Sequence, residues 1–260
     1  MKYLSLAKRM IKIRLSNAFA YKADFFTIIF AKIIGDLVGP LLALFIYQST
    51  LGIPGWTFEQ FILFQGTFIL VLGLSVSISA DIFWHVFGAI DSGTFDKYLL
   101  KPYNSWLFLM ALSTNWEGFA EISLGIILIT YSIIKLDIAI TSIAFIIYLS
   151  LIMMGVLFFT SAYTILAAGS IVAVRNEALL NLFHRMLDFA RYPLDVYSSA
   201  IKFSLTFLFP LAVGSFYPAT VLIHGGAGNL AALYLPTIGF FIASLEIWHY
   251  SIKKHNSAGG

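Results

Sequence analysis

Long apolar stretches separated by short polar connections run along the chain. A bilayer core needs about 20 apolar residues per helix. By that measure the pattern predicts membrane spans over 24–47, 58–82, 105–131 and 229–250. A further stretch, 138–174, holds no charged residue and is too long for one ordinary crossing. It predicts a helix that continues into a hairpin, with these candidate turn positions: Gly155, Thr160, Ser161, Thr164 and Gly169.

The region that follows is more polar and is interrupted by Pro193, Pro210 and Pro218. Because proline lacks a backbone donor and disfavours helix at the preceding residue, this region cannot form one clean span. One interpretation is a fifth span over 165–190, with 191–226 forming short helices that dip into the outer face of the membrane. The other keeps 175–197 in the cytoplasm and places the fifth span at 198–224.

Both interpretations predict six spans with the two termini on one side, and the basic residues assign that side to the cytoplasm. The outer side carries Lys135 alone in the second interpretation and also Arg191 and Lys202 in the first, so the charge distribution mildly favours the second. The basic residues on the inner side in both are Lys2, Lys8, Arg9, Lys12, Arg14, Lys22, Lys97, Lys101, Lys253 and Lys254.

The first 22 residues have the pattern of a basic amphipathic helix and lack the cleavage site of a signal peptide. The alternative is a partly disordered basic leader. One helical face would carry Lys2, Ser5, Lys8, Arg9, Lys12 and Ser16, and the other Leu4, Ala7, Ile11, Leu15 and Ala18. We expect this helix to lie in the headgroup layer of the membrane.

Composition agrees with an all-α membrane protein that forms a single domain over 1–260. Charged residues make up 11% of the chain, against about 25% in a soluble domain. The absence of cysteine excludes disulfides and cysteine nucleophiles. No phosphate-binding P-loop motif occurs, so any ATPase must be another polypeptide. Two sets of residues are expected at surfaces rather than in sites: His85, His184, His224, His249 and His255, and the interfacial anchors Trp56, Trp106 and Trp248.

Residues 89–102, AIDSGTFDKYLLKP, form a polar connection between the second and third predicted spans. Gly93 permits a turn and Pro102 ends the helix. The segment therefore predicts a helix of about two turns with Phe95, Tyr98 and Leu99 on one face. The candidate N-caps are Asp91, Ser92 and Thr94. Because so short a helix is marginal in water, the membrane surface or a partner must stabilise it.

Two pairs of charged residues stand out within the predicted spans, where a charge is costly and usually faces the bundle interior or water. Lys32 and Asp36, at i and i+4, are expected to neutralise each other. Glu117 and Glu121 have the same spacing with no basic residue between them, a pattern that suits proton transfer or cation binding.

Several separated segments resemble the ABC-2 type permease family: AYKADFF, GAIDSGTFDKYLLKPYN, FARYPLDVY, LFPLAVGSFYPA and the short basic tail. The resemblance covers essentially the whole chain. It implies a six-span permease subunit of an ATP-driven transporter, an exporter in the inner or plasma membrane. It also places the proline-rich region at the outer face, which favours the first topology. Arg185 and Asp188 depart from that picture, because they would lie within the fifth span.

The resemblance further implies that 89–102 is a coupling helix that docks on the ATPase. Its matching residues are Asp91, Thr94, Phe95, Asp96, Lys97, Tyr98, Leu99 and Lys101. The implied partners are two ATPase subunits, which bind the ATP, and a second permease subunit, identical or related. No cofactor of the chain's own, no metal and no nucleic acid is implied. Two rivals are a proton- or cation-coupled secondary transporter using Glu117 and Glu121, and a lipid-modifying enzyme, for which no nucleophile or metal set is present.

Overall fold

The computed structural model describes residues 12, 22–50, 52–173, 177–226 and 228–255. The predicted interfacial helix lies outside the described residues, apart from Lys12 and Lys22. Every element in the described part is helical, and five helices are long and apolar enough to cross a membrane. These are α2 (Lys22–Ser49), the helix Phe58–Asp91, α7 (Gly118–Lys135), α8 (Ser142–Val172) and α12 (Leu230–Lys254).

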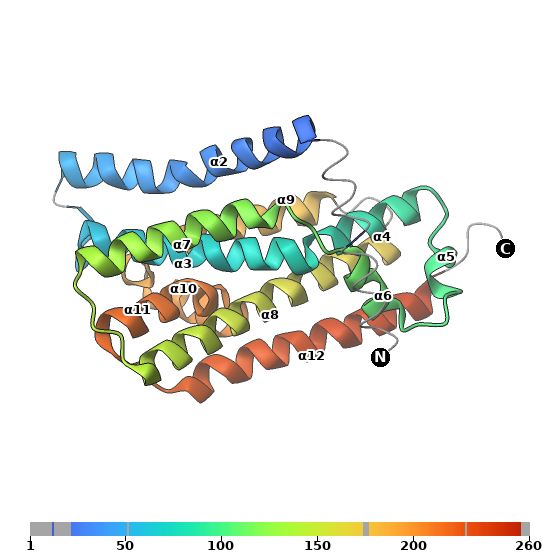
Figure 1. The fold of residues 1–260 in the computed structure, drawn as a ribbon. Helices are drawn as coiled ribbons and strands as arrows, with labels where there is room; N and C mark the ends of the chain where they lie inside the picture. Colours follow the sequence, from blue (N-terminus) through green and yellow to red (C-terminus); the bar gives the residue numbers. More distant parts are fainter. Residues whose placement is uncertain (1–11, 13–21, 51, 174–176, 227, 256–260) are drawn as a thin grey trace.

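The long helices lie lengthwise beside one another, and shorter helices gather at the two ends of the bundle (Figure 1). One end, here called the α5 end, holds α4 (Asp81–Asp91), α5 (Asp96–Leu99), α6 (Ser105–Leu112) and the last turns of α12. The opposite end, here called the α11 end, holds α10 (Ser199–Phe203) and α11 (Phe216–His224).

The second predicted span is confirmed but extends further. It consists of α3 (Phe58–Ser75), the π-helical turn η1 (Val76–Ala80) and α4, which continue as one helix of 34 residues. Thr57 and Gln60 start α3 with a reciprocal capping box, which satisfies two of its free N–H groups.

The predicted third span over 105–131 is wrong, because two separate helices replace it. Asn104 caps α6, and its side chain accepts a hydrogen bond from the Leu107 N–H. The helix ends at Leu112, and α7 begins at Gly118. The intervening polar segment, residues 113–117, bonds to neighbouring helices instead of continuing either helix.

The hairpin expected within 138–174 is also wrong, since α8 is one uninterrupted helix of 31 residues. Its hydroxyl groups do not break it, because they bond within the helix: Ser161 Oγ donates to the Leu157 carbonyl and Thr164 Oγ1 to the Thr160 carbonyl. At 1.5 Å per residue α8 is about 46 Å long, which exceeds the hydrocarbon thickness of about 30 Å.

Neither proposed fifth span forms a continuous helix. The first is interrupted between α8 and α9 (Glu177–Leu187), and the second contains the break at Pro210. Short pieces follow α9: η2 (Asp188–Arg191), η3 (Leu194–Val196), α10, η4 (Ser204–Leu208), η5 (Leu211–Gly214) and α11. Figure 1 shows α9 beginning toward the α5 end, whereas α10 and α11 lie at the α11 end.

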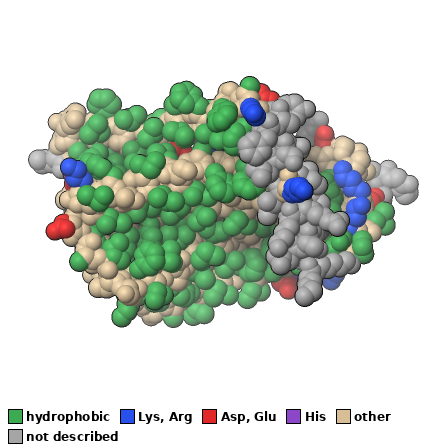
Figure 2. Space-filling model, viewed as in Figure 1, with side chains coloured by type: hydrophobic (Ala, Val, Ile, Leu, Met, Phe, Trp, Pro, Cys, Tyr) green, Lys and Arg blue, Asp and Glu red, His purple; other side chains and the backbone are tan. Residues whose placement is uncertain are grey.

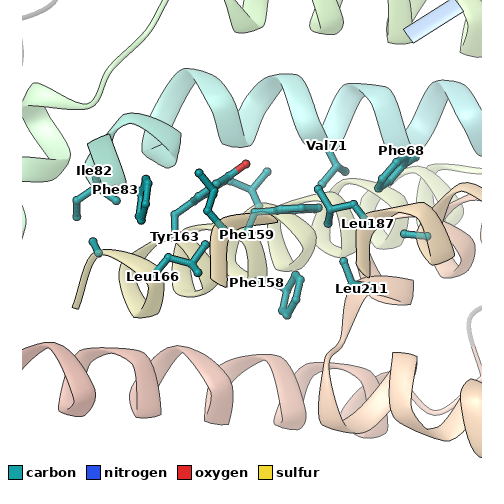
Figure 3. Packing of buried hydrophobic residues seen from close by; sticks show 14 of the residues in the cluster. Phe68, Val71, Ile82, Phe83, Phe158, Phe159, Tyr163, Leu166, Leu187 and Leu211 are labelled. Carbon is teal, nitrogen blue, oxygen red and sulfur yellow. The ribbon is translucent and has the colours of Figure 1, made fainter. Parts of the chain in front are cut away.

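The apolar core is centred on α8. Figure 3 shows Phe158, Phe159 and Tyr163 of α8 facing side chains of α3, α4, α9 and η5. By contrast, the outer surface on view is largely hydrophobic over the length of the bundle (Figure 2). Large exposed apolar side chains such as Phe45 and Ile127, each 63% exposed, suit contact with lipid.

The three tryptophans expected as interfacial anchors point inward instead. Trp248 is fully buried. Trp56 Nε1 donates to Asp195 over 3.0 Å, and Trp106 Nε1 donates to Thr164 Oγ1 over 3.1 Å. Trp56 and Trp106 therefore join separate segments of the bundle.

Candidate functional site

The connection after α4 turns sharply at Gly93, whose φ of 64° lies in the left-handed region that favours glycine. The Thr94 N–H donates to the Ala89 carbonyl, which closes the turn over the end of α4. Ser92 Oγ donates to the Gly88 carbonyl over 2.7 Å and contacts Thr94 Oγ1 at 2.9 Å. The predicted turn is confirmed, but these hydroxyls cap the end of α4 rather than the start of α5.

The helix within 89–102 is shorter than expected. Asp91 is the last residue of α4, and α5 is a single turn, Asp96–Leu99. Phe95 occupies its N-cap position and provides no side-chain cap. The expected two-turn helix with Asp91, Ser92 or Thr94 as its cap is therefore wrong. Without a side-chain cap, the free N–H groups of the first turn are not satisfied locally, and a helix this short is only marginally stable.

The aromatic face of this segment packs against its own chain. Phe95 is 1% exposed and contacts the rings of Tyr98 and His255 edge-on. Tyr98 in turn packs against Phe108 of α6. The expectation that Phe95 is presented to a partner does not match this burial; its side chain supports the segment from within.

The end of α12 fixes the same segment. His255, which follows α12, lies 3.0 Å from the Asp96 carboxylate. Its side chain is 13% exposed, so it is not the surface residue that the sequence analysis expected. Sequence reasoning missed this contact because 159 positions separate the two residues and no motif links them.

After the turn, the outward surface of the segment includes Lys97, Leu100 and Lys101, all of them exposed; residues 91–94 and Pro102 are exposed as well. Leu100 is 83% exposed, although it lies among residues that bury their apolar groups. This connection therefore presents one large apolar side chain, Leu100, to its surroundings, with Lys97 and Lys101 beside it.

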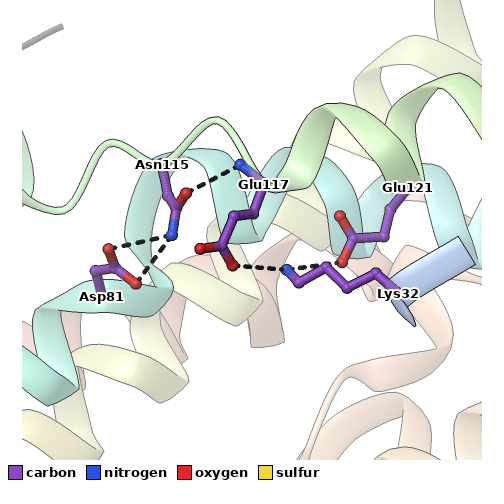
Figure 4. A network of polar contacts seen from close by, with 5 residues as sticks. All are labelled: Lys32, Asp81, Asn115, Glu117 and Glu121. Atoms are coloured by element: carbon purple, nitrogen blue, oxygen red, sulfur yellow. Dashed lines mark hydrogen bonds and ion pairs between the residues drawn. The ribbon is translucent and has the colours of Figure 1, made fainter. Parts of the chain in front are cut away.

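A second polar site joins α2 to α7 (Figure 4). Lys32 Nζ lies 3.4 Å from Glu117 Oε2 and 3.2 Å from Glu121 Oε1. Lys32 therefore pairs with these two glutamates across the helices rather than with Asp36, as was expected, and it gives Glu117 and Glu121 a basic partner from outside their own helix. Lys32 reaches across to α7 because the two carboxylates together attract its ammonium more strongly than one neighbouring acid does.

This site lies at the start of α7. Glu117 directly precedes α7, and Glu121 is in its first turn. Asn115 continues the site toward α4: its Nδ2 donates to both Asp81 oxygens at 3.2 and 3.3 Å, and its Oδ1 accepts from the Glu117 N–H. Sequence reasoning missed Asp81 and Asn115, although an acid inside the second span was a usable signal.

Asp188 and Arg191 form a third polar site beside α2 and α3. The Arg191 Nε lies 3.4 Å from Asp188 Oδ1. Gln65 of α3, which is 3% exposed, donates to the Arg191 carbonyl over 2.7 Å. Asp188 is thereby paired within η2, whereas Arg185 on α9 remains exposed.

The helices and their surface define a multi-pass α-helical membrane protein. A family model described as ABC-2 family transporter protein matches residues 34–259. The chain belongs to this family. A comparison with curated proteins found no match.

Proposed function

We propose that the chain is the permease subunit of an ATP-driven ABC exporter in the inner or plasma membrane. Membership of the ABC-2 family supports this function, since such permeases usually work with a separate ABC ATPase. The chain has no P-loop of its own. Lysines near the α5 end, among them Lys97, Lys101, Lys253 and Lys254, favour a cytosolic location for that end.

The ATPase docks at the α5 end through Leu100, with Lys97 and Lys101 beside it. The observation that carries this assignment is the 83% exposure of Leu100 on a segment fixed from within by Phe95 and His255. A buried apolar anchor surrounded by charged groups is the usual arrangement of an interface, in which the anchor supplies affinity and the rim orientation. The expected partner surface is an apolar pocket with acidic residues at its edge.

Replacing Leu100 by Ser tests the docking surface. We expect the amount of co-purified ATPase to fall by about tenfold or more, and cargo-stimulated ATP hydrolysis to fall with it. Leu107→Ser is the matched control, because Leu107 is 40% exposed on neighbouring α6 and lies outside the surface. Unchanged ATPase recovery with Leu100→Ser would refute the docking assignment.

The sixth crossing is supplied by α9 and the short segments after it, and 191–226 forms a re-entrant region at the outer face. Figure 1 supports this path, because the chain starts α9 toward the α5 end and reaches α10 at the α11 end. Asn181, His184 and Arg185 are exposed along α9. Exposed polar groups at membrane depth are costly in lipid, which supports a second permease subunit, identical or related, on this face. Two ATPase subunits complete the assembly.

The rival function is proton- or cation-coupled transport through Glu117 and Glu121. One observation favours it: Glu121 Oε2 is buried and has no hydrogen-bond partner among the described residues. Lys32 weakens it, since this ammonium already occupies the position between the carboxylates that a cation would take. Transport measured with intact ATP but with both the proton gradient and the cation gradients collapsed separates the two, because only the rival loses activity.

A further inference from the structure

The N-terminal half of α2 is only weakly embedded in the described bundle. From Lys22 to Gly39 no residue of α2 is buried, whereas Pro40 and Ala43 are. In Figure 1, α2 runs along one edge of the bundle. Within the described residues, its ion pairs to the bundle are the two that Lys32 makes with Glu117 and Glu121.

The start of α7 is, by contrast, firmly attached to the helix that leads to α5. The π-helical turn η1 interrupts the regular α-helical hydrogen bonding of that helix. Within this turn, the Ser77 carbonyl accepts a hydrogen bond from the Asn115 N–H over 3.0 Å. Gly118 lies so close that a Cβ on it would overlap the Gly73 carbonyl oxygen and Ser77 Oγ. Segment 113–117 and η1 are therefore one packed unit.

A continuous set of contacts thus connects the α5 end with α2. From the turn at Gly93, α4 runs back to Asp81, a distance of about 16 Å at 1.5 Å per residue. Asp81 accepts from Asn115, which accepts from the Glu117 N–H, and Glu117 with Glu121 binds Lys32 (Figure 4).

We infer that Lys32 is the positioning residue through which movement of α4 and α7 reaches α2. This inference rests on the proposed function, because the ATPase supplies the movement at α5. When α4 and the start of α7 shift together, the two carboxylates carry the ammonium with them. The poorly embedded half of α2 follows, while its buried part near Ala43 acts as the pivot.

Three features make Lys32 suited to this role. The Glu121 side chain is 9% exposed, so its ion pair is only weakly screened by solvent. Two acceptors hold the ammonium at once, so it keeps a partner during a small displacement. Without Lys32, the two ion pairs that attach α2 to α7 would be lost, and the neighbouring carboxylates of Glu117 and Glu121 on α7 would have no compensating charge from α2.

The absence of cysteine makes a direct distance measurement practical. Spin labels on cysteines at Phe30 of α2 and Ile127 of α7, which are 66% and 63% exposed, report the separation of the two helices in the complex with the ATPase. In the otherwise wild-type complex we expect a nucleotide-dependent change in this distance. With Lys32→Met we expect that change to be lost, and transport per ATP hydrolysed to fall by about three- to thirtyfold.

Lys135→Met is the matched control, because it removes an exposed lysine from the other end of α7 and should preserve both readouts. Lys32→Arg should also preserve them. The exchange Lys32→Glu with Glu121→Lys should restore part of the distance change, which a merely destabilising substitution would not allow.

The inference is overturned if Lys32→Met leaves the nucleotide-dependent distance change intact, while the proposed function stands. It is also overturned if the otherwise wild-type complex binds ATPase but shows no distance change. If no ATPase associates with the wild-type chain, the proposed function itself fails. ATPase recovery therefore separates the two failures.

Discussion

The two neighbours of α7 contact it in opposite ways. Toward α3, glycines bring the backbones together: a Cβ on Gly125 would lie 2.7 Å from Leu70 N and 2.8 Å from the Gly66 carbonyl oxygen. Toward α2, the ends of the long side chains of Lys32 and two glutamates make the ion pairs. Lipid provides little hydrophobic drive between helices, so close packing is what fixes α3 and α7 together. The difference separates a rigid unit, α3 with α7, from a helix whose ion pairs with α7 depend on the ends of long side chains.

The substitution Gly118→Val should break the rigid unit and have the largest effect. The added side chain has no space against Gly73 and Ser77. Overpacking typically costs about 1–3 kcal/mol, and contact with backbone places this site at the upper end. We expect little folded protein in detergent, measured by thermal unfolding. Gly88→Ala is the control, because nothing lies within 4 Å of its added Cβ; equal losses in both variants would contradict the packing argument.

Phe95→Ala extends the comparison to the α5 end, where packing is also expected to set stability. Phe95 is 1% exposed, and a truncation of this kind costs about 3 kcal/mol or more. We expect a lower unfolding temperature and faster hydrogen exchange across 89–102. Leu100→Ala, in the same segment but on its exposed side, should leave both unchanged. If the two variants behave alike, the division of this segment into an inner and an outer face is wrong.

His255→Ala should have the smallest effect on stability. The substitution removes the contact between the His255 ring and the Asp96 carboxylate. Because the Asp96 side chain is 40% exposed, solvent screens this pair. The expected cost is below about 1 kcal/mol. Hydrogen exchange of the α5 amides should nevertheless rise by about two- to fivefold, because the segment loses its attachment to α12. His249→Ala, an exposed position on the same helix, is the control, and unchanged exchange at α5 would show that His255 does not hold the segment.

Apolar periodicity was enough to predict the helical class and most of the spans. It failed in two places, one where polar side chains bond within their own helix and one where a helix end depends on distant partners. The hydroxyls of α8 read as a turn signal, although they bond within the helix. The break before Gly118 depends on contacts of Asn115 with Ser77 and Asp81, which no local pattern encodes.

The sites were predicted only in part, again because contacts between distant residues leave no local pattern in the sequence. The turn at Gly93 follows from local chemistry and was predicted correctly. The inward side of Phe95 depends on His255, at the far end of the chain. Charge spacing at i and i+4 selected Lys32, Glu117 and Glu121 of the site between α2 and α7, but it paired Lys32 with Asp36, because spacing along one helix says nothing of the helix opposite.

The docking of a separate ATPase on Leu100 is tested most directly by photocrosslinking from that position. A photoreactive amino acid placed at 100 in the full chain, expressed with its transport partners, should form an adduct with an ATPase subunit. The same group at Gly226, an exposed position after α11, should form none. An ATPase adduct from position 226 and none from position 100 would contradict the account.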